Sequence, residues 1–516
     1  MKRLSLSPFA IITLLLISST LSAQVQTDIR LISDKGIGSI DKNKEFIIDS
    51  ISFDPFYDPN ADSKFRTTAS TVSTYVIAGS QGNKRFKVQA RNFPRDLSSL
   101  KPVEDNLQNY WFTKNLSTLK VISEIKDLYK TRSDIEAEAN EYINMLAKYD
   151  LIYDDPFLES YLYSIVTKII PTNRADGFPY DIKVVLVRDE SMNACVFPNG
   201  IMIVNTGLLA ELHTEDELVA ALSHEIAHFV GNHTLVNIRT MEKKVARAEF
   251  WAAFATAAAA TTEIVAASQG NQYVNGTLTM NTAILSSAIA SEVISRLGAN
   301  FNKEQEKEAD LMAMDVLGYL GYDKNAAASL FQRMTDAYNA EGNWAAYYLS
   351  GDHPSLRERI QYSGNPSSKQ DPTFERKISF AVTDAAISKY NRGRFNQAYK
   401  LVSQNISNGV ATDDDYLLKA LCTLNLYSDL SHNREALSLV QQSKDLNANN
   451  ANILRTEIIA NLRCNDKNRA SSLLNSYMNQ LSDNMAKISD KESCTYQFYT
   501  NEFEWARKMS IKVKGL

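Results

Sequence analysis

The sequence predicts an α+β fold that is mainly helical, and three observations support this prediction. Residues 24–115 carry short runs of β-branched and aromatic residues, which are typical of strands. Residues 116–365 place apolar residues at helical spacing around one small β-hairpin. Residues 371–516 are polar and helical, with alanines at a spacing typical of helical repeats. We therefore expect an N-terminal β-rich region, a central domain and a C-terminal repeat domain.

Residues 1–23 have the pattern of a signal peptide. The basic start Met1-Lys2-Arg3 precedes an apolar core from Phe9 to Ile17 and the small-residue site Leu21-Ser22-Ala23. We expect cleavage after Ala23 and an exported chain. The apolar core is shorter than the roughly 20 residues of a membrane-spanning helix, and an uncleaved anchor is the alternative.

The N-terminal β-rich region is expected to contain strands at residues 46–53, 75–78 and 86–90. Residues 79–83 are the expected turn between the last two strands. This region carries no cluster of chemically distinctive residues, so the sequence assigns it no function.

The central domain is expected to begin with a long polar helix over residues 117–148 and a second helix over 157–170. The β-branched run 182–187 predicts a buried strand, and a hairpin should surround Pro198-Asn199-Gly200. Its first strand, formed by Asn193, Ala194, Cys195 and Val196, would let an extended peptide add by backbone pairing. A hairpin with a structural role is the alternative, and both interpretations are compatible.

His224-Glu225-Ile226-Ala227-His228 matches the pattern H-E-x-x-H. Thr214 and Glu217 predict a capping box just before it, and apolar residues continue at helical spacing. On such a helix His224 and His228 share one face and can bind a single zinc ion. Glu225 lies one step round the helix, where it is suited to deprotonate a water molecule for peptide hydrolysis. Two incidental histidines, one paired with Glu225, are the alternative.

A catalytic zinc site needs a third protein ligand. The extended pattern H-E-x-x-H-x-x-G-x-x-H fits at Gly231 but fails at Thr234, because His233 comes one residue too early. That class of site is therefore rejected.

A glutamate from a second helix is the remaining option for the third ligand. Glu306 supplies it, and Asp310 lies four residues later on the same face, where it would orient a ligand imidazole. Glu308 faces another way and is the reserve ligand. A solvated acidic helix face is the alternative for this segment.

These motifs together resemble family 48 of the metallopeptidases, the group of the CAAX prenyl endopeptidases, HtpX and BepA. The resemblance covers residues 150–362. Besides Glu215-Asp216-Glu217-Leu218, the H-E-x-x-H motif, His233 and residues 306–310, two further segments agree in the family's order. They are the hairpin of Asn193-Ala194, Pro198-Asn199-Gly200 and Thr206-Gly207-Leu208-Leu209, and His353-Pro354 with Arg359.

The resemblance implies a gluzincin fold with one Zn²⁺ per chain, bound by His224, His228 and Glu306. It further implies Glu225 as the catalytic base and Asp310 as a supporting residue. Arg359 would be a second supporting residue beside the ligands. His353 is implied to approach the metal, where it would regulate the site or stabilise the oxyanion. The match favours the soluble, exported branch of the family, which implies a periplasmic or secreted protein.

Residues 250–268 are rich in alanine and threonine. The uncharged run ends at Glu263, before the length that a membrane crossing needs. We expect a helix near the active site that acts as a lid or plug, with contact to a membrane surface as a further hypothesis.

The C-terminal region is expected to hold two to three degenerate tetratricopeptide-like repeats. Ala436 and Ala470 are 34 positions apart (470 − 436), the period of that repeat, although Ala398 and Ala436 are 38 apart (436 − 398). Such repeats form a groove for protein segments, so an envelope protein partner is expected there. A helical bundle that only supports the protease domain is the alternative.

Charge and cysteine content narrow the function further. The net charge of −5 argues against a nucleic-acid partner. The four cysteines show no metal-site spacing; Cys464 and Cys494 are a plausible disulfide, and Cys195 is expected to be a buried thiol.

The sequence thus predicts a zinc metalloendopeptidase. The resemblance and the repeats suggest misfolded or stalled envelope proteins as its substrates. The alternative is a chaperone-like or scaffold protein whose metal site is capped or latent. The complete set of ligands and base favours the enzyme.

Overall fold

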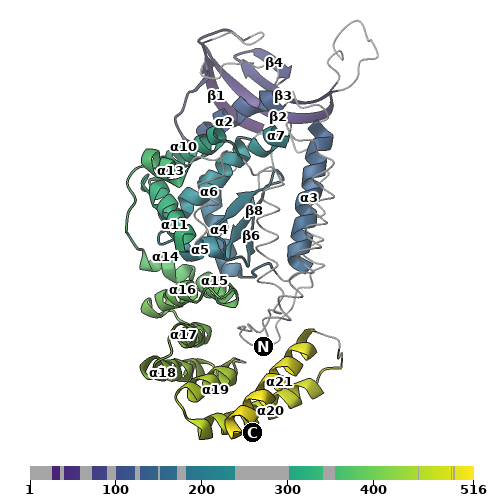
Figure 1. Cartoon of the computed structure of the whole chain (residues 1–516). Helices are drawn as coiled ribbons and strands as arrows, with labels where there is room; N and C mark the ends of the chain where they lie inside the picture. The colour runs from purple at the N-terminus through teal and green to yellow at the C-terminus, as the bar shows by residue number, and fades with distance from the viewer. Residues whose placement is uncertain are drawn as a thin grey trace.

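The computed structural model of the chain describes residues 26–34, 40–57, 72–89, 100–122, 128–148, 151–170, 182–238, 301–340, 355–450, 452–489, 491 and 494–515. Figure 1 shows an N-terminal sheet at one end, the helices around the H-E-x-x-H motif in the middle and a curved series of helices at the other end. The predicted mainly helical α+β class is confirmed. The expected signal peptide, residues 250–268 and His353 lie outside the described residues.

The N-terminal region forms a five-stranded antiparallel sheet in the order β4-β3-β2-β1-β5. The expected strands correspond to β2, β3 and β4, whereas the sequence pattern does not reveal β1 and β5. Gly79 allows β3 to pass beneath Phe86, because a Cβ at residue 79 would lie 2.1 Å from the Ile47 carbonyl oxygen and 2.5 Å from the Phe86 ring. The strands are β1 (Gln26–Ser33), β2 (Glu45–Tyr57), β3 (Val72–Gln81), β4 (Lys84–Gln89) and β5 (Leu100–Pro102).

The helical stretch after the sheet begins earlier than predicted and is two helices, α2 (Leu107–Ile122) and α3 (Leu128–Lys148). Asn106 starts α2, because its side chain accepts a hydrogen bond from the Asn109 backbone N–H at 2.9 Å. Helix α2 contributes Leu116 and Leu119 to the core of the sheet and Trp111 to the central core. It therefore joins the two regions and crosses the boundary proposed between residues 115 and 116.

The central region packs a small sheet against helices. Strand β6 (Lys183–Val187) pairs in parallel with β8 (Ile201–Asn205), and β7 (Ala194–Val196) pairs antiparallel with β8 at the edge. This arrangement confirms the predicted strand and hairpin, although β6 is only partly buried, with Lys183 exposed and Leu186 and Val187 buried. The helices are α4 (Pro156–Ile169), α5 (Thr206–Glu211), α6 (Glu215–Val230), α7 (His233–Ile238), α10 (Lys303–Leu320), α11 (Ala326–Ala340) and α13 (Leu356–Ser363).

Helix α6 carries the H-E-x-x-H motif and is buried along most of its length. Its N-cap is Thr214, whose hydroxyl accepts a hydrogen bond from the Glu217 N–H at 3.2 Å. The Glu217 carboxylate accepts from the His213 N–H at 2.7 Å, one residue before the cap. The predicted capping box is therefore only half formed, and its second bond anchors the preceding turn.

The C-terminal region is a succession of helices in which each packs against the next (Figure 1). Ala398, Ala436 and Ala470 are fully buried in alternate helices. Cys464 is a free thiol, so the predicted disulfide with Cys494 is not formed. The helices are α14 (Pro372–Lys377), α15 (Ser379–Asn391), α16 (Phe395–Ser407), α17 (Asp413–Leu426), α18 (Leu430–Leu446), α19 (Ile453–Arg463), α20 (Lys467–Ala486) and α21 (Cys494–Lys514).

Buried charges join the C-terminal helices to the loop before β7. Arg188 pairs with Asp384 of α15 at 2.5 Å. The Glu190 carboxylate is 2% exposed and lies 2.9 Å from both Arg392 and Arg394 in the turn between α15 and α16. The first C-terminal helices are thus held against the loop between β6 and β7. No helix in the described part of the chain has both the length and the apolar character that a bilayer crossing requires.

Candidate metal centre

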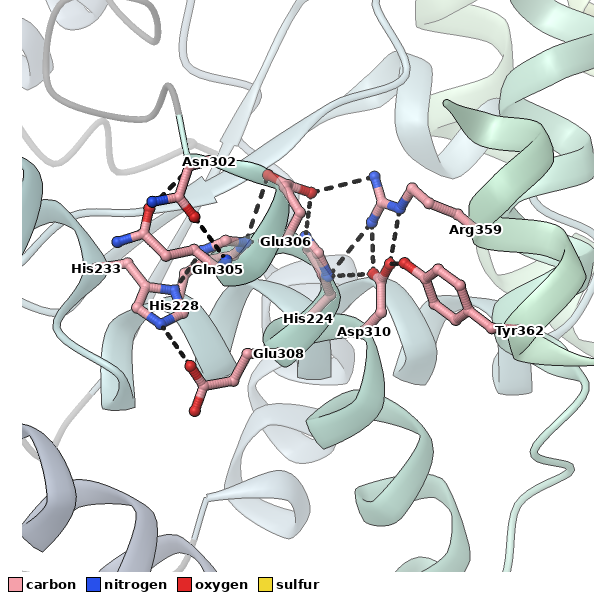
Figure 2. A network of polar contacts seen from close by, with 10 residues as sticks. All are labelled: His224, His228, His233, Asn302, Gln305, Glu306, Glu308, Asp310, Arg359 and Tyr362. Atoms are coloured by element: carbon pink, nitrogen blue, oxygen red, sulfur yellow. Dashed lines mark hydrogen bonds and ion pairs between the residues drawn. The ribbon is translucent and has the colours of Figure 1, made fainter. Parts of the chain in front are cut away.

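Helices α6 and α10 bring the three predicted ligands together (Figure 2). The Nε2 atoms of His224 and His228 face each other at 3.1 Å. The Glu306 carboxylate lies 3.6 Å from His224 Nε2 and 3.8 Å from His228 Nε2. Two nitrogens bound to one tetrahedral zinc ion would be about 3.3 Å apart. The spacing and the donor set of two imidazoles and a carboxylate therefore fit zinc.

The start of α10 fixes the position of Glu306. Asn302 and Gln305 form a reciprocal capping box, in which the Gln305 N–H donates to the Asn302 side chain at 2.9 Å. The Asn302 N–H donates in turn to the Gln305 side chain at 3.1 Å. Glu306 follows immediately, so its side chain leaves a first turn that is already ordered.

Asp310 contacts the imidazole of His224, the first candidate ligand, in the place predicted for it. Its Oδ1 lies 2.8 Å from His224 Nδ1, and Tyr362 donates its hydroxyl hydrogen to Oδ2. Burial would raise the pKa of Asp310, but the charges of Arg359 and His224 hold it well below the usual range. An ionised Asp310 accepts the Nδ1 proton of His224, which leaves the Nε2 lone pair free for a metal.

Arg359 links the two carboxylates of α10. It donates to Asp310 from Nε at 2.8 Å and from Nη2 at 2.6 Å, while its Nη1 lies 3.3 Å from Glu306 Oε2. The guanidinium carbon sits 4.1 Å from the centre of the Phe331 ring. One buried cation thus contacts both a candidate metal ligand, Glu306, and the carboxylate that contacts a second candidate ligand.

The second imidazole has a different set of neighbours. His228 Nδ1 lies 2.9 Å from His233 Nδ1, and Phe301 stacks on the His228 ring with 3.7 Å between centroids. Glu308 does not join the cluster but lies 3.6 Å from His233 Nε2 (Figure 2). Sequence reasoning missed the contact between His233 and His228, although the Gly231-Asn232 pair before His233 signals a turn that could return it to α6.

Glu225 is half-buried beside the cluster. Burial raises its pKa to about 7, with His224 opposing the shift and Glu306 adding to it. A bound cation would oppose this shift, because positive charge favours the carboxylate. Burial raises the pKa of the Cys195 thiol, and the negative charge of the nearby Glu225 raises it further. Strand β7 therefore runs past the predicted base.

The edge strand presents part of its backbone away from β8. Asn205 N–H donates to the Asn193 carbonyl at 3.2 Å, and Phe197 N–H donates to the Ile201 carbonyl at 2.8 Å. These pairs alternate with residues whose backbone groups point the other way, here Ala194 and Val196. The thiol of Cys195 is free and buried, as expected.

Comparison with known proteins agrees with this geometry. The sequence model of Peptidase family M48 matches residues 156–363, which contain the whole metal cluster. The mitochondrial metalloendopeptidase OMA1 of Schizosaccharomyces pombe is 28% identical over 215 residues, which cover 40% of this chain and 55% of the relative.

Several bacterial relatives carry the name beta-barrel assembly-enhancing protease, among them those of Yersinia pestis and Escherichia coli K12. The Yersinia pestis protein is 25% identical over 229 residues, or 44% of this chain and 42% of the relative. The Escherichia coli K12 protein is 22% identical over 255 residues, or 49% and 48%. The chain spans about half the length of the curated relatives it matches. Over residues 156–363, this chain is therefore similar to Peptidase family M48.

Proposed function

We propose that the chain is a zinc-dependent endopeptidase. The observation that supports this most directly is the convergence of the ligand atoms of His224, His228 and Glu306 within 4.8 Å of one another, next to Glu225. Three protein ligands leave one position of a tetrahedral ion open, which is the arrangement of catalytic rather than structural zinc.

His224, His228 and Glu306 would hold the metal. Bound zinc would supply a Lewis acid that lowers the pKa of water and polarises a carbonyl. Glu225 would accept the proton of the attacking water and donate it to the leaving amine, because its carboxylate lies beside the ligand cluster. Asp310 and Arg359 keep the ligands oriented while these transfers occur.

The substrate would be an extended peptide that pairs with β7. The outward backbone groups of Ala194 and Val196 offer main-chain hydrogen bonds, which recognise a peptide without strong sequence preference. Phe197 is buried at the end of the strand, so the strand is held in place before a substrate adds to it.

We further propose that the substrates are misfolded or stalled envelope proteins. The chain would encounter them in the periplasm, after its export is directed by the signal peptide of residues 1–23. The bacterial relatives are named beta-barrel assembly-enhancing proteases, which supports substrates connected with β-barrel assembly. The C-terminal helices are proposed as tetratricopeptide-like repeats that contact an envelope partner, because they form a continuous curved series (Figure 1).

Two variants test whether the chain binds zinc and hydrolyses peptide bonds. We expect purified protein to bind one zinc ion per chain and to lose it in His224→Ala. Glu225→Gln should keep the metal but lower casein hydrolysis by about 10²- to 10⁴-fold, because general base catalysis is lost. If the wild-type chain binds clients but shows no proteolysis to lose, the chaperone-like alternative replaces this proposal.

A further inference from the structure

The turn that follows α6 brings His233 back onto His228, one of the proposed metal ligands. We propose that His233 is a positioning residue: it holds the Nδ1 hydrogen of His228 and so directs His228 Nε2 into the cluster. We propose also that the N-terminal sheet holds His233 in this place. The inference rests on the zinc site of the proposed function.

The direction of the hydrogen bond follows from the chemistry of the imidazole. His228 Nε2 faces His224 Nε2 at 3.1 Å, so a metal there requires an unprotonated Nε2 on both rings. A neutral His228 then carries its hydrogen on Nδ1, which lies 2.9 Å from His233 Nδ1. His233 must accept this hydrogen, so its own hydrogen is on Nε2, the nitrogen 3.6 Å from Glu308 Oε2.

The local sequence is shaped for this contact. Asn232 adopts a left-handed conformation with φ of 50°, which reverses the chain between α6 and α7. Gly231 makes room for the returning ring, because a Cβ at residue 231 would lie 2.6 Å from His233 Nε2 and 2.9 Å from its Cδ2. A glycine and a left-handed asparagine are thus both needed to place His233 beside His228.

Contacts with α2 and with the core of the five-stranded sheet hold the turn between α6 and α7 in place. The Asn232 side-chain amide donates to the Thr118 hydroxyl of α2 at 2.9 Å. Asn115 of α2 donates to the Val230 carbonyl at 3.4 Å. Leu235, two residues after His233, is 3% exposed in the core of the five-stranded sheet. The β-rich region, to which the sequence assigns no function, therefore supports one side of the metal centre.

The two ligand histidines are consequently held in different ways. His224 donates directly to the buried Asp310, which Arg359 keeps ionised. His228 donates to another imidazole, which faces the half-exposed Glu308 at a distance longer than a hydrogen bond. The contact at His228 Nδ1 therefore depends on the placement of His233 by the turn, whereas the contact at His224 Nδ1 is with a buried carboxylate.

A pair of substitutions separates positioning from packing. His233→Asn places an acceptor oxygen near the position of Nδ1, while His233→Leu fills a similar volume without an acceptor. We expect His233→Leu to lower zinc affinity about 10- to 100-fold, and His233→Asn to retain most of the affinity. Affinity is measured by competition with a chromogenic chelator, and the visible spectrum of the cobalt-substituted protein reports the ligand geometry.

The matched control is the same pair of substitutions at His213. This histidine is also largely buried, and it pairs with Glu375 at 2.8 Å, away from the cluster. His213→Asn and His213→Leu should change the unfolding midpoint but leave zinc affinity and the cobalt spectrum unchanged.

A second variant tests the placement without touching the imidazole. Gly231→Ala should displace the His233 ring and weaken zinc binding as His233→Leu does. Gly318→Ala in α10 is its control, because the three atoms nearest to the added Cβ all belong to the flexible Lys324 side chain.

The outcomes are distinct. Equal zinc affinity in wild type, His233→Asn and His233→Leu would overturn the positioning role while leaving the zinc site intact. A wild-type chain that binds no zinc would overturn both this inference and the proposed function.

Discussion

Arg359 and Asp310 form a two-pronged ion pair, in which the guanidinium donates to separate carboxylate oxygens at 2.8 and 2.6 Å. The residues are 49 positions apart, yet this pair connects α13 to the α10 turn that carries Glu306. The geometry exploits the planar fork of arginine, because a third nitrogen of the same group reaches Glu306 at 3.3 Å.

Arg359→Lys should weaken the metal site even though it keeps the charge. A single ammonium cannot bridge Asp310 and Glu306 in the way a guanidinium does, so zinc affinity should fall about 10-fold or more. Chelator competition measures the effect. Arg357→Lys, an exposed position on the same helix, is the control and should match wild type.

Val196→Pro should impair substrate binding more than turnover. The substitution removes an N–H that points away from β8, and proline is tolerated on edge strands, so the hairpin should survive. We expect KM for an extended peptide to rise while kcat changes little. Val196→Thr keeps the N–H and should behave as wild type; a KM that is unaffected by proline would exclude β7 as the pairing edge.

Replacing both Arg392 and Arg394, the partners of Glu190, with alanine should destabilise the fold by more than the sum of the destabilisations in the two single variants. After Arg392→Ala the carboxylate still pairs with Arg394, whereas the double variant leaves a buried charge unpaired, a loss of about 3–5 kcal/mol. Urea denaturation of the two single variants and the double variant measures the coupling. Simple additivity would show that the pairs act independently.

The stability of the Arg392→Ala/Arg394→Ala variant should depend on pH. Burial raises the pKa of Glu190, while Arg392 and Arg394 oppose the shift. Without them the folded-state pKa rises further above the unfolded value, so protonation favours the folded state and stability is lost as pH increases through the folded pKa. The stability deficit should therefore shrink at acidic pH, and a deficit independent of pH would contradict this explanation.

Zinc should raise the thermal stability of the chain, because the ligands come from two helices that the metal would join. Free zinc at about 100 times the dissociation constant adds about 2.7 kcal/mol to the free energy of unfolding. Calorimetry with zinc and with a chelator measures the shift. The double variant His224→Ala/His228→Ala should show no shift with zinc.

Much of the local structure is determined by the sequence. The apolar periodicity and the Thr214 cap predict α6, the β-branched run predicts β6, and the Pro198-Asn199-Gly200 turn predicts the hairpin. The spacing within H-E-x-x-H places His224 and His228 on one face, since residues four apart on a helix are neighbours. The choice of Glu306 over Glu308 also follows from the helical period once Asp310 is considered.

Only the tertiary structure decided the relationships that depend on packing between distant segments. The start of α2 at Asn106 and strands β1 and β5 have weak local signals, and their positions follow from the core they share. The contact of His233 with His228 requires the left-handed turn at Asn232, which α2 and the sheet stabilise. Sequence spacing describes a residue along its own element, whereas the return of His233 depends on a chain reversal and on partners more than 100 positions away.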